Sequence, residues 1–234
     1  MLEKNNYILV LGSKPDSKIP LIEVSNIYAA NGASEIGTFY KTFYPKTKLI
    51  SIVGGKEFEK NIEVQRRVLE SKPEELISRS GNINISKYNF TNLMKYSFFT
   101  HYRALFFNPF FFKKNFFDVL IKETFYEKDL LNKIKHMYRC FRYGVLTGVS
   151  TGFFSILYAL KNHPECQILI LGIGMSKGSH LYNDNNRYDK RSIVDRKLIL
   201  SLKKKYLSRL ITTDINFAKH AEIQTWNKET INEK

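Results

Sequence analysis

The sequence predicts an α/β fold with a Rossmann-like, mainly parallel sheet flanked by helices. Short apolar runs that end in small-residue turns recur along the chain, and helical patterns lie between them. The runs are unbroken rather than alternating, which is typical of strands that helices cover on both faces. The length of 234 residues favours one domain, residues 1–234, that carries an insertion.

Four apolar runs are each followed by a turn of small residues. The runs and the residues after them are 7–11 with Gly12 and Ser13, 27–30 with Asn31 and Gly32, 49–53 with Gly54, and 168–171 with Gly172 and Gly174. Glycine in such a turn lets the backbone approach a ligand closely. Parallel strands end at one edge of a sheet, so the four turns are expected to converge on one ligand-binding crevice. Their spacing matches neither GxGxxG nor GxxxxGK[ST].

The triplet Ser150-Thr151-Gly152 precedes a long apolar run that predicts a buried helix. A serine or threonine at this place can cap the helix. Free backbone N–H groups at a helix N-terminus, next to the end of a strand, favour an anionic ligand.

Other segments complete the predicted order of elements. We expect helices over 57–71, 129–142 and 195–207, a last strand over 209–213, and a polar tail over 226–234. Asp195 is then a carboxylate in the first turn of its helix, which the helix dipole stabilises.

The composition limits the class of partner and the compartment. A formal net charge of +15 indicates nucleic acid, an anionic membrane surface or a negatively charged substrate. The two cysteines give neither a disulfide framework nor a CxxC metal spacing. The histidines show no metal-ligand spacing either, so no metal site is predicted. The first residues do not look like a secretory signal, and we expect a reduced, cytoplasmic setting.

The insertion, residues 88–143, interleaves aromatic and basic residues. Three interpretations remain open: aromatic stacking on single-stranded nucleic acid, a segment that lies in a membrane interface, or a helical lid whose aromatic residues form a local core. The basic helix expected over 129–142 presents a cationic face either to anionic lipid or to solvent.

A polar loop over 178–191 follows the fourth strand and is the predicted catalytic segment. His180 can exchange a proton near neutral pH. Tyr182 can donate a hydrogen bond to a phosphate oxygen, and Arg187 can hold an anion. A charged surface loop without a catalytic role is the alternative.

The order of these motifs resembles that of bacterial sialyltransferases and related transferases of 3-deoxy-ulosonic acids. Ser150-Thr151-Gly152 is also similar to the small sialyl motif of the animal sialyltransferases. The likeness covers 8–53 and 144–200. It implies that a cytidine monophosphate (CMP) donor is bound by Gly12, Ser13, Asn31, Ser150, Thr151 and Gly152. It also implies that Tyr182 binds the phosphate of the donor.

The chain departs from the family at three positions. Gly174 stands where the family has an acidic residue, and Ser176 where it has its first phosphate-binding tyrosine. The base histidine of the family falls on Lys190 or Arg191. Either His180 deprotonates the acceptor hydroxyl from another position, or the acceptor needs no such base.

The resulting expectation is a metal-independent glycosyltransferase with no cofactor besides a CMP-sugar donor substrate. It would transfer a sialic acid-like or Kdo-type sugar to a cell-surface glycan such as lipooligosaccharide or capsule, at the inner face of the membrane. The insertion 88–143 would make a peripheral membrane contact, and no nucleic acid is expected. The alternatives are a pterin diphosphokinase-like or other nucleotide-binding enzyme, and a basic module that binds single-stranded nucleic acid.

Overall fold

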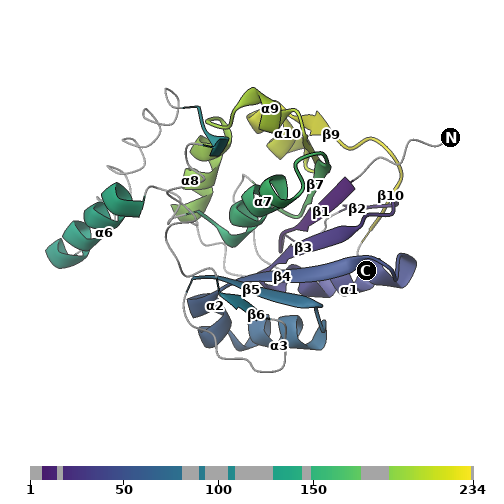
Figure 1. Ribbon diagram of the computed structural model, residues 1–234, viewed down its shortest axis with the longest axis horizontal. Coiled ribbons are helices and arrows are strands. Elements are labelled where there is room, and N and C mark those ends of the chain that lie inside the picture. The colour runs from purple at the N-terminus through teal and green to yellow at the C-terminus, as the bar shows by residue number, and fades with distance from the viewer. Residues whose placement is uncertain are drawn as a thin grey trace.

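The computed structural model confirms the predicted α/β fold (Figure 1). It describes residues 7–14, 18–80, 90–92, 105–108, 129–143, 149–174 and 190–232. The larger sheet has eight strands in the order β6-β5-β4-β3-β1-β7-β8-β9, and all neighbouring pairs are parallel. These strands are β1 (Tyr7–Leu11), β3 (Asn26–Ala30), β4 (Lys48–Gly54), β5 (Glu75–Ser80), β6 (Phe90–Asn92), β7 (Gln167–Leu171), β8 (Leu210–Thr212) and β9 (Gln224–Thr225).

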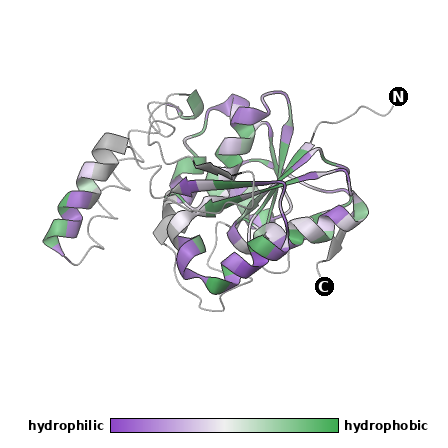
Figure 2. Cartoon of the chain, turned by 60° about the horizontal axis from the view of Figure 1, so that its bottom comes forward, coloured by the Kyte–Doolittle hydropathy of each residue, from purple (hydrophilic) through white to green (hydrophobic). Residues whose placement is uncertain are grey.

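Helices lie against both faces of this sheet (Figure 1). They are η1 (Asn31–Ala33), α1 (Ser34–Phe43), α2 (Gly55–Lys60), α3 (Ile62–Glu70), α7 (Thr151–Asn162), α8 (Lys190–Ile199), α9 (Lys204–Leu207) and α10 (Ile215–Ala221), whereas α6 (Leu130–Tyr143) lies apart from the sheet (Figure 2). Alternate residues of β1 separate the two cores. Ile8 and Val10 pack in the cluster that includes α7, whereas Leu9 and Leu11 pack in the cluster that includes α1. Burial on both faces explains why the strand is apolar throughout.

The order of the strands reverses between β1 and β7. From β1 the chain proceeds outward through β3, β4, β5 and β6, and it then returns to the other side of β1 to form β7, β8 and β9. In open α/β sheets the carboxyl ends of strands at such a switch point commonly bind ligands.

The single helix predicted over 57–71 is two helices. The break is at Asn61, which adopts an extended backbone (φ −107°, ψ 98°), and its side chain accepts a hydrogen bond from the backbone N–H of Val64. An asparagine that caps a new helix in this way competes with continuation of the old one. Ile62, counted with the apolar side of the predicted helix, is 82% exposed.

The helix predicted over 195–207 is also wrong. The structure has α8 up to Ile199 and the separate short α9, with a hydrogen-bonded turn at 198–203 between them. Asp195 therefore lies within α8 rather than at its start, and it is buried.

The described part of the segment predicted as a polar tail, residues 226–232, lies against the body of the protein. Trp226 is 8% exposed, and its ring meets the ring of Tyr7 edge-on at 5.7 Å between centroids. Beyond it, β10 (Thr230–Asn232) pairs antiparallel with β2 (Lys18–Pro20) in a second, two-stranded sheet. The aromatic anchor accounts for the order of this otherwise polar segment.

Most of the insertion 88–143 lies outside the described residues. Within the described part, Phe106 and Phe107 are 0% and 1% exposed and belong to the core that includes α7. Helix α6 is confirmed from Leu130 to Tyr143, and Figure 2 shows it apart from the sheet, with hydrophobic and hydrophilic residues mixed along it. Among the described helices none is long and apolar enough to cross a membrane.

Candidate functional site

The four glycine-containing turns lie at one edge of the sheet, as predicted. Strands β4, β3, β1 and β7 are consecutive neighbours and parallel, so the residues that follow them gather at the same edge. The first turn of α7 reaches this edge as well. A Cβ atom built on Gly152 would lie 3.2 Å from Ile173, and one built on Gly54 would lie 3.7 Å from the Thr151 Oγ1 atom.

The junction between β1 and β7 is closed by backbone contacts. The N–H of Gly12 donates to the Leu171 carbonyl at 2.7 Å, and the N–H of Lys14 donates to the Gly172 carbonyl at 2.9 Å. A Cβ atom on Gly12 would lie 2.3 Å from the Gly172 carbonyl oxygen. Gly172 itself has a φ of 65°, in the left-handed region that favours glycine. The packing of the two strand ends is therefore sufficient to explain both glycines.

Beside this junction, an ion pair joins the ends of β1 and β8. The Nζ atom of Lys14 lies 2.6 Å from Oδ2 of Asp214. Asp214 also caps α10, because its Oδ1 accepts a hydrogen bond from the N–H of Phe217 at 2.9 Å. Burial tends to raise the pKa of Asp214, but the hydrogen bonds from Lys14 and from backbone N–H groups outweigh it and lower that pKa. Asp214 therefore stays ionised in the folded protein near neutral pH.

Asn31 links the turn after β3 to the turn after β4. Its backbone has a φ of 52°, which asparagine tolerates better than most residues, and its Oδ1 accepts a hydrogen bond from the N–H of Gly54 at 3.2 Å. The hydroxyl of Ser34 donates to the Asn31 carbonyl at 3.0 Å. Gly32, between Asn31 and α1, is buried. The predicted Asn31 and Gly32 thus shape the turn through their own contacts.

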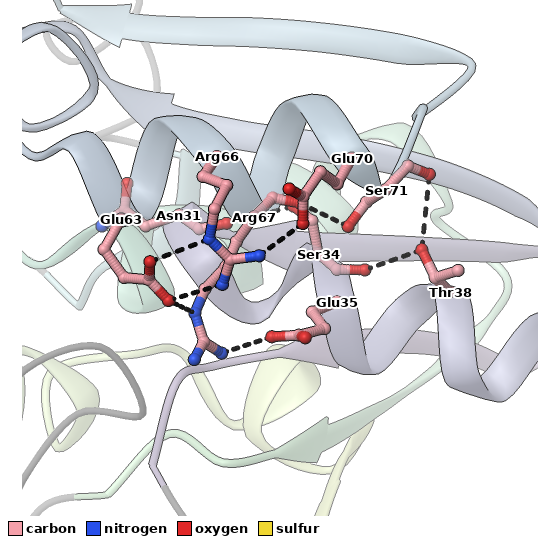
Figure 3. A network of polar contacts seen from close by, with 9 residues as sticks. All are labelled: Asn31, Ser34, Glu35, Thr38, Glu63, Arg66, Arg67, Glu70 and Ser71. Atoms are coloured by element: carbon pink, nitrogen blue, oxygen red, sulfur yellow. Dashed lines mark hydrogen bonds and ion pairs between the residues drawn. The ribbon is translucent and has the colours of Figure 1, made fainter.

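Behind this turn, a network of charged side chains ties α3 to α1 (Figure 3). The Arg67 guanidinium contacts Glu63 at 2.6 Å and Glu35 at 2.5 Å, while Arg66 contacts Glu63 at 2.8 Å. Hydrogen bonds from Arg66 and Arg67 lower the pKa of Glu63 to about 2. Through the contact of Arg67 with Glu35, the network links α3 to α1 next to the turn at Asn31.

Ser150 caps α7, as the sequence predicts. Its backbone is extended (φ −65°, ψ 161°), and its Oγ accepts a hydrogen bond from the N–H of Phe153 at 3.0 Å. The N–H of Ser150 donates to Oδ1 of Asp195 at 3.0 Å, and Asp195 is only 4% exposed. Asp195 on α8 thus fixes the residue that starts α7. Thr151 is also buried, at 4% exposure.

A buried arginine lies next to the start of α7. Arg79, on β5, is 8% exposed, and its Nη1 donates to the Val149 carbonyl at 2.6 Å. Its Nε lies 4.0 Å from the position of a Cβ atom on Gly54. The guanidinium is also 6.0 Å from the centre of the Phe154 ring. This part of the edge brings together a buried cation, the unobstructed side of a glycine and the N-terminus of α7, where the Asp195 carboxylate already accepts the N–H of Ser150. The cation and the remaining N–H donors of the first helical turn are features suited to an anion.

The three predicted catalytic residues, His180, Tyr182 and Arg187, lie outside the described residues. The described residues on either side of their segment are at the same edge: Gly174 follows β7, and Asp195 of α8 contacts Ser150. A Cβ atom on Gly174 would lie 3.1 Å from the Lys14 side chain. In the described ranges, no group of three or more His, Cys, Asp or Glu side chains is arranged to hold a metal ion.

Comparison of the chain with protein-family models, with curated proteins and with solved structures gives no match. The residues at this edge are therefore the basis for inferring a function.

Sequence reasoning missed Arg79 and the partner of Asp195. Arg79 lies in a segment of mixed polarity, Glu75 to Ser80, that does not look like a strand, and the signal that could have marked it is a basic residue next to a strand end. Asp195 was recognised as a helix carboxylate, but its partner, the N–H of Ser150, is 45 positions away in the chain. Only the fold brings such a pair together.

Proposed function

We propose that the chain is a glycosyltransferase that moves a sialic acid-like or Kdo-type sugar from a CMP-activated donor to a cell-surface glycan. The observation that carries the proposal is the buried Arg79 beside the capped start of α7, at the carboxyl edge of the parallel sheet. A CMP-activated ulosonic acid brings a phosphate and a carboxylate, and both need compensating positive charge or N–H donors.

The likeness to the sialyltransferase family supports the same position for the donor. The residues that the likeness implies at the donor site, Gly12, Ser13, Asn31 and Ser150 to Gly152, gather at this edge and not elsewhere in the fold. In the proposal, Gly12 and Asn31 act by shaping the turns around the nucleotide. The backbone N–H groups of Thr151 and Gly152, in the first turn of α7, donate hydrogen bonds to the phosphate.

The proposed reaction is the displacement of CMP from the anomeric carbon of the sugar. The acceptor hydroxyl oxygen forms a bond to that carbon, while the bond from the carbon to the phosphate oxygen breaks and its electron pair stays on the phosphate. Tyr182 and Arg187 stabilise the charge that develops on the departing phosphate. His180 accepts the proton of the acceptor hydroxyl. In the sequence, these three residues lie between Gly174 and Asp195, which are both at the carboxyl edge of the sheet. The proposal requires their side chains to extend to that edge.

A thermal-shift series tests the binding step. We expect CMP to raise the melting temperature of the protein, because a ligand at 100 times its Kd stabilises the native state by about 2.7 kcal/mol. UDP and GDP serve as matched nucleotides. A larger shift with a pterin or with ATP would favour the pterin diphosphokinase-like alternative. Stabilisation only by single-stranded DNA, with a steep dependence on salt, would favour the nucleic-acid-binding alternative.

A turnover assay tests the chemistry. The release of CMP from CMP-sialic acid or CMP-Kdo is measured with a lipooligosaccharide acceptor, for the wild type and for Tyr182→Phe. Loss of the phenolic hydroxyl should lower kcat about 100-fold or more and leave the melting temperature unchanged. An unchanged kcat would remove Tyr182 from the mechanism. The His180→Gln variant should shift the pH dependence of kcat as well as lower it.

A further inference from the structure

Helix α6 exposes an apolar stripe. Five large apolar side chains in its described part are 41–71% exposed. They are Leu130, Leu131, Ile134, Met137 and Tyr138. Their spacing of three and four residues places them on one side of the helix. A buried face would not retain this exposure, so the stripe is available at the surface of the protein.

Positive charge borders the stripe on both sides. At 3.6 residues per turn, Lys133 lies beside one margin of the stripe and Lys135 beside the other. The sequence of α6 contains no aspartate or glutamate and four lysine or arginine residues. An apolar stripe between cationic margins is the pattern of a helix that lies in the surface of an anionic membrane.

Two other aromatic residues of the insertion, Phe106 and Phe107, behave differently. Both are buried, and the Phe106 ring meets the ring of Tyr206 at 4.9 Å between centroids. They belong to the protein core, so lipid has no access to them. The insertion is therefore divided: at least this part supplies core, while α6 presents apolar surface.

The length of α6 limits how it can meet a bilayer. Fourteen residues at 1.5 Å each make a helix of about 21 Å, shorter than the roughly 30 Å hydrocarbon core of a bilayer. The helix can therefore lie along the interface but not cross it. A second copy of the chain is a poorer occupant of the stripe, because two α6 helices would bring like charges together.

We propose that α6 docks the protein on an anionic lipid surface. Ile134 and its apolar neighbours enter the boundary between headgroups and acyl chains, and Lys133 and Lys135 contact lipid phosphates. The inference does not rest on the donor proposed above. If the proposed function also holds, α6 keeps the crevice near an acceptor that is anchored in the same membrane.

Sedimentation with lipid vesicles tests the apolar part of the proposal. The full chain should bind vesicles that contain phosphatidylglycerol and should bind vesicles of pure phosphatidylcholine much more weakly. Ile134→Glu should lower the partition coefficient at least 10-fold. Ile62→Glu is the matched control, since it adds the same charge at an exposed isoleucine on α3 and should leave binding unchanged.

The charged part is tested with a pair of double variants. Lys133→Ala with Lys135→Ala should weaken binding to the anionic vesicles roughly 30-fold, whereas Lys204→Ala with Lys219→Ala, which changes the net charge equally, should have a much smaller effect. Equal effects of the two double variants would mean that only overall charge matters, which overturns the role of α6.

Two further outcomes would also overturn the proposal. One is the absence of binding between the wild-type protein and anionic vesicles. The other is a wild-type oligomer that Ile134→Glu converts to a monomer without a change in vesicle binding, since a second copy would then cover the stripe. Thermal unfolding of every variant confirms that the fold is intact. A thermal shift with CMP is measured separately, so failure of the donor proposal and failure of membrane docking give different results.

Discussion

Two junctions at the same edge of the sheet use glycine for different reasons. At the β1/β7 junction, a side chain on Gly12 would collide with the backbone of Gly172. At the junction of β4 with α7, a side chain on Gly54 would meet nothing closer than the Thr151 hydroxyl at 3.7 Å, with Arg79 at 4.0 Å. The first glycine makes room for the protein itself, whereas the second leaves space beside a buried cation.

The difference refines what a glycine after a strand can indicate. All the turns have similar sequences, so sequence alone predicts that each is an equivalent part of one ligand site. Backbone packing divides them into one closed junction that holds the central strands together and one open junction suited to an anion. Stability measurements and ligand-binding measurements should separate the two.

The largest effect is expected from Gly12→Ala at the closed junction. The added methyl group meets a backbone carbonyl that cannot move without shifting β7, so the unfolding free energy should fall by about 3 kcal/mol. Urea denaturation measures it. A loss below about 0.5 kcal/mol would show that the β1/β7 junction is more adaptable than its contacts indicate.

Arg79→Met at the open junction should have the next largest effect. It removes the hydrogen bond to the Val149 carbonyl and leaves that oxygen buried, which costs about 1–3 kcal/mol. It should also abolish the thermal shift caused by CMP, measured against the melting temperature of the variant itself. Arg66→Met, at an exposed arginine, is the control and should change neither quantity appreciably. Retention of the CMP shift in Arg79→Met would remove Arg79 from the proposed site.

Ser150→Ala removes the N-terminal cap of α7, the helix that forms the open junction with β4. The expected loss of stability is about 1 kcal/mol, measured by urea denaturation. Ser150→Thr keeps a hydroxyl that can accept the hydrogen bond from Phe153 and should recover most of the loss. If the threonine variant is as unstable as the alanine variant, the hydroxyl is not the source of the stabilisation.

The ion pair at the closed junction predicts a smaller, pH-dependent effect. The folded-state pKa of Asp214 is lowered, so the pair contributes stability above the ordinary aspartate pKa of about 4 and loses it as the pH falls below that value. Asp214→Asn keeps an oxygen that can cap α10 but loses the charge. Between about pH 5 and pH 3 the wild type should lose stability faster than this variant, by less than about 1 kcal/mol because Lys14 is partly exposed. Parallel curves would assign the acid sensitivity to other carboxylates.

The smallest effect on stability is expected from Gly54→Ala. The backbone at Gly54 (φ −82°, ψ 122°) suits any residue, and the nearest atoms are at ordinary contact distance, so the unfolding free energy should change by less than about 0.5 kcal/mol. The CMP shift should nevertheless decrease, because the methyl group fills space in front of Arg79. A stability loss equal to that of Gly12→Ala would erase the distinction between the two junctions.

The sequence was informative where one short segment carried the whole signal. The apolar strand Tyr7–Leu11 has the predicted bounds, because an unbroken apolar run can be satisfied only by burial on both faces. A cap by a serine or threonine of 150–152 was also predicted, and the structure identifies it as Ser150, whose hydroxyl acts within three residues of its own position.

The sequence was less informative where a distant partner decides the structure. Helix α1 and strand β5 were not predicted: polar residues are mixed into both, and Arg79 is held in β5 by a carbonyl 70 positions away. The end segment was mistaken for a tail because its order depends on Tyr7 at the other end of the sequence. Asn61 is compatible with a continuous helix from sequence alone. The structure shows that its side chain accepts the N–H of Val64 and so caps a new helix.

The position of β1 in the sheet has a consequence for synthesis of the chain on the ribosome. Tyr7 pairs with Gln167, so one edge of β1 waits for a partner that is made about 160 residues later. At the usual rate of about 5–20 residues per second, this edge stays uncovered for roughly 8–30 s. Strands β3, β4 and β5 are made during that time and pair on the other side of β1, so a half-sheet formed before β7 would leave the apolar β1 at its open edge. An exposed apolar strand of this kind is prone to aggregation.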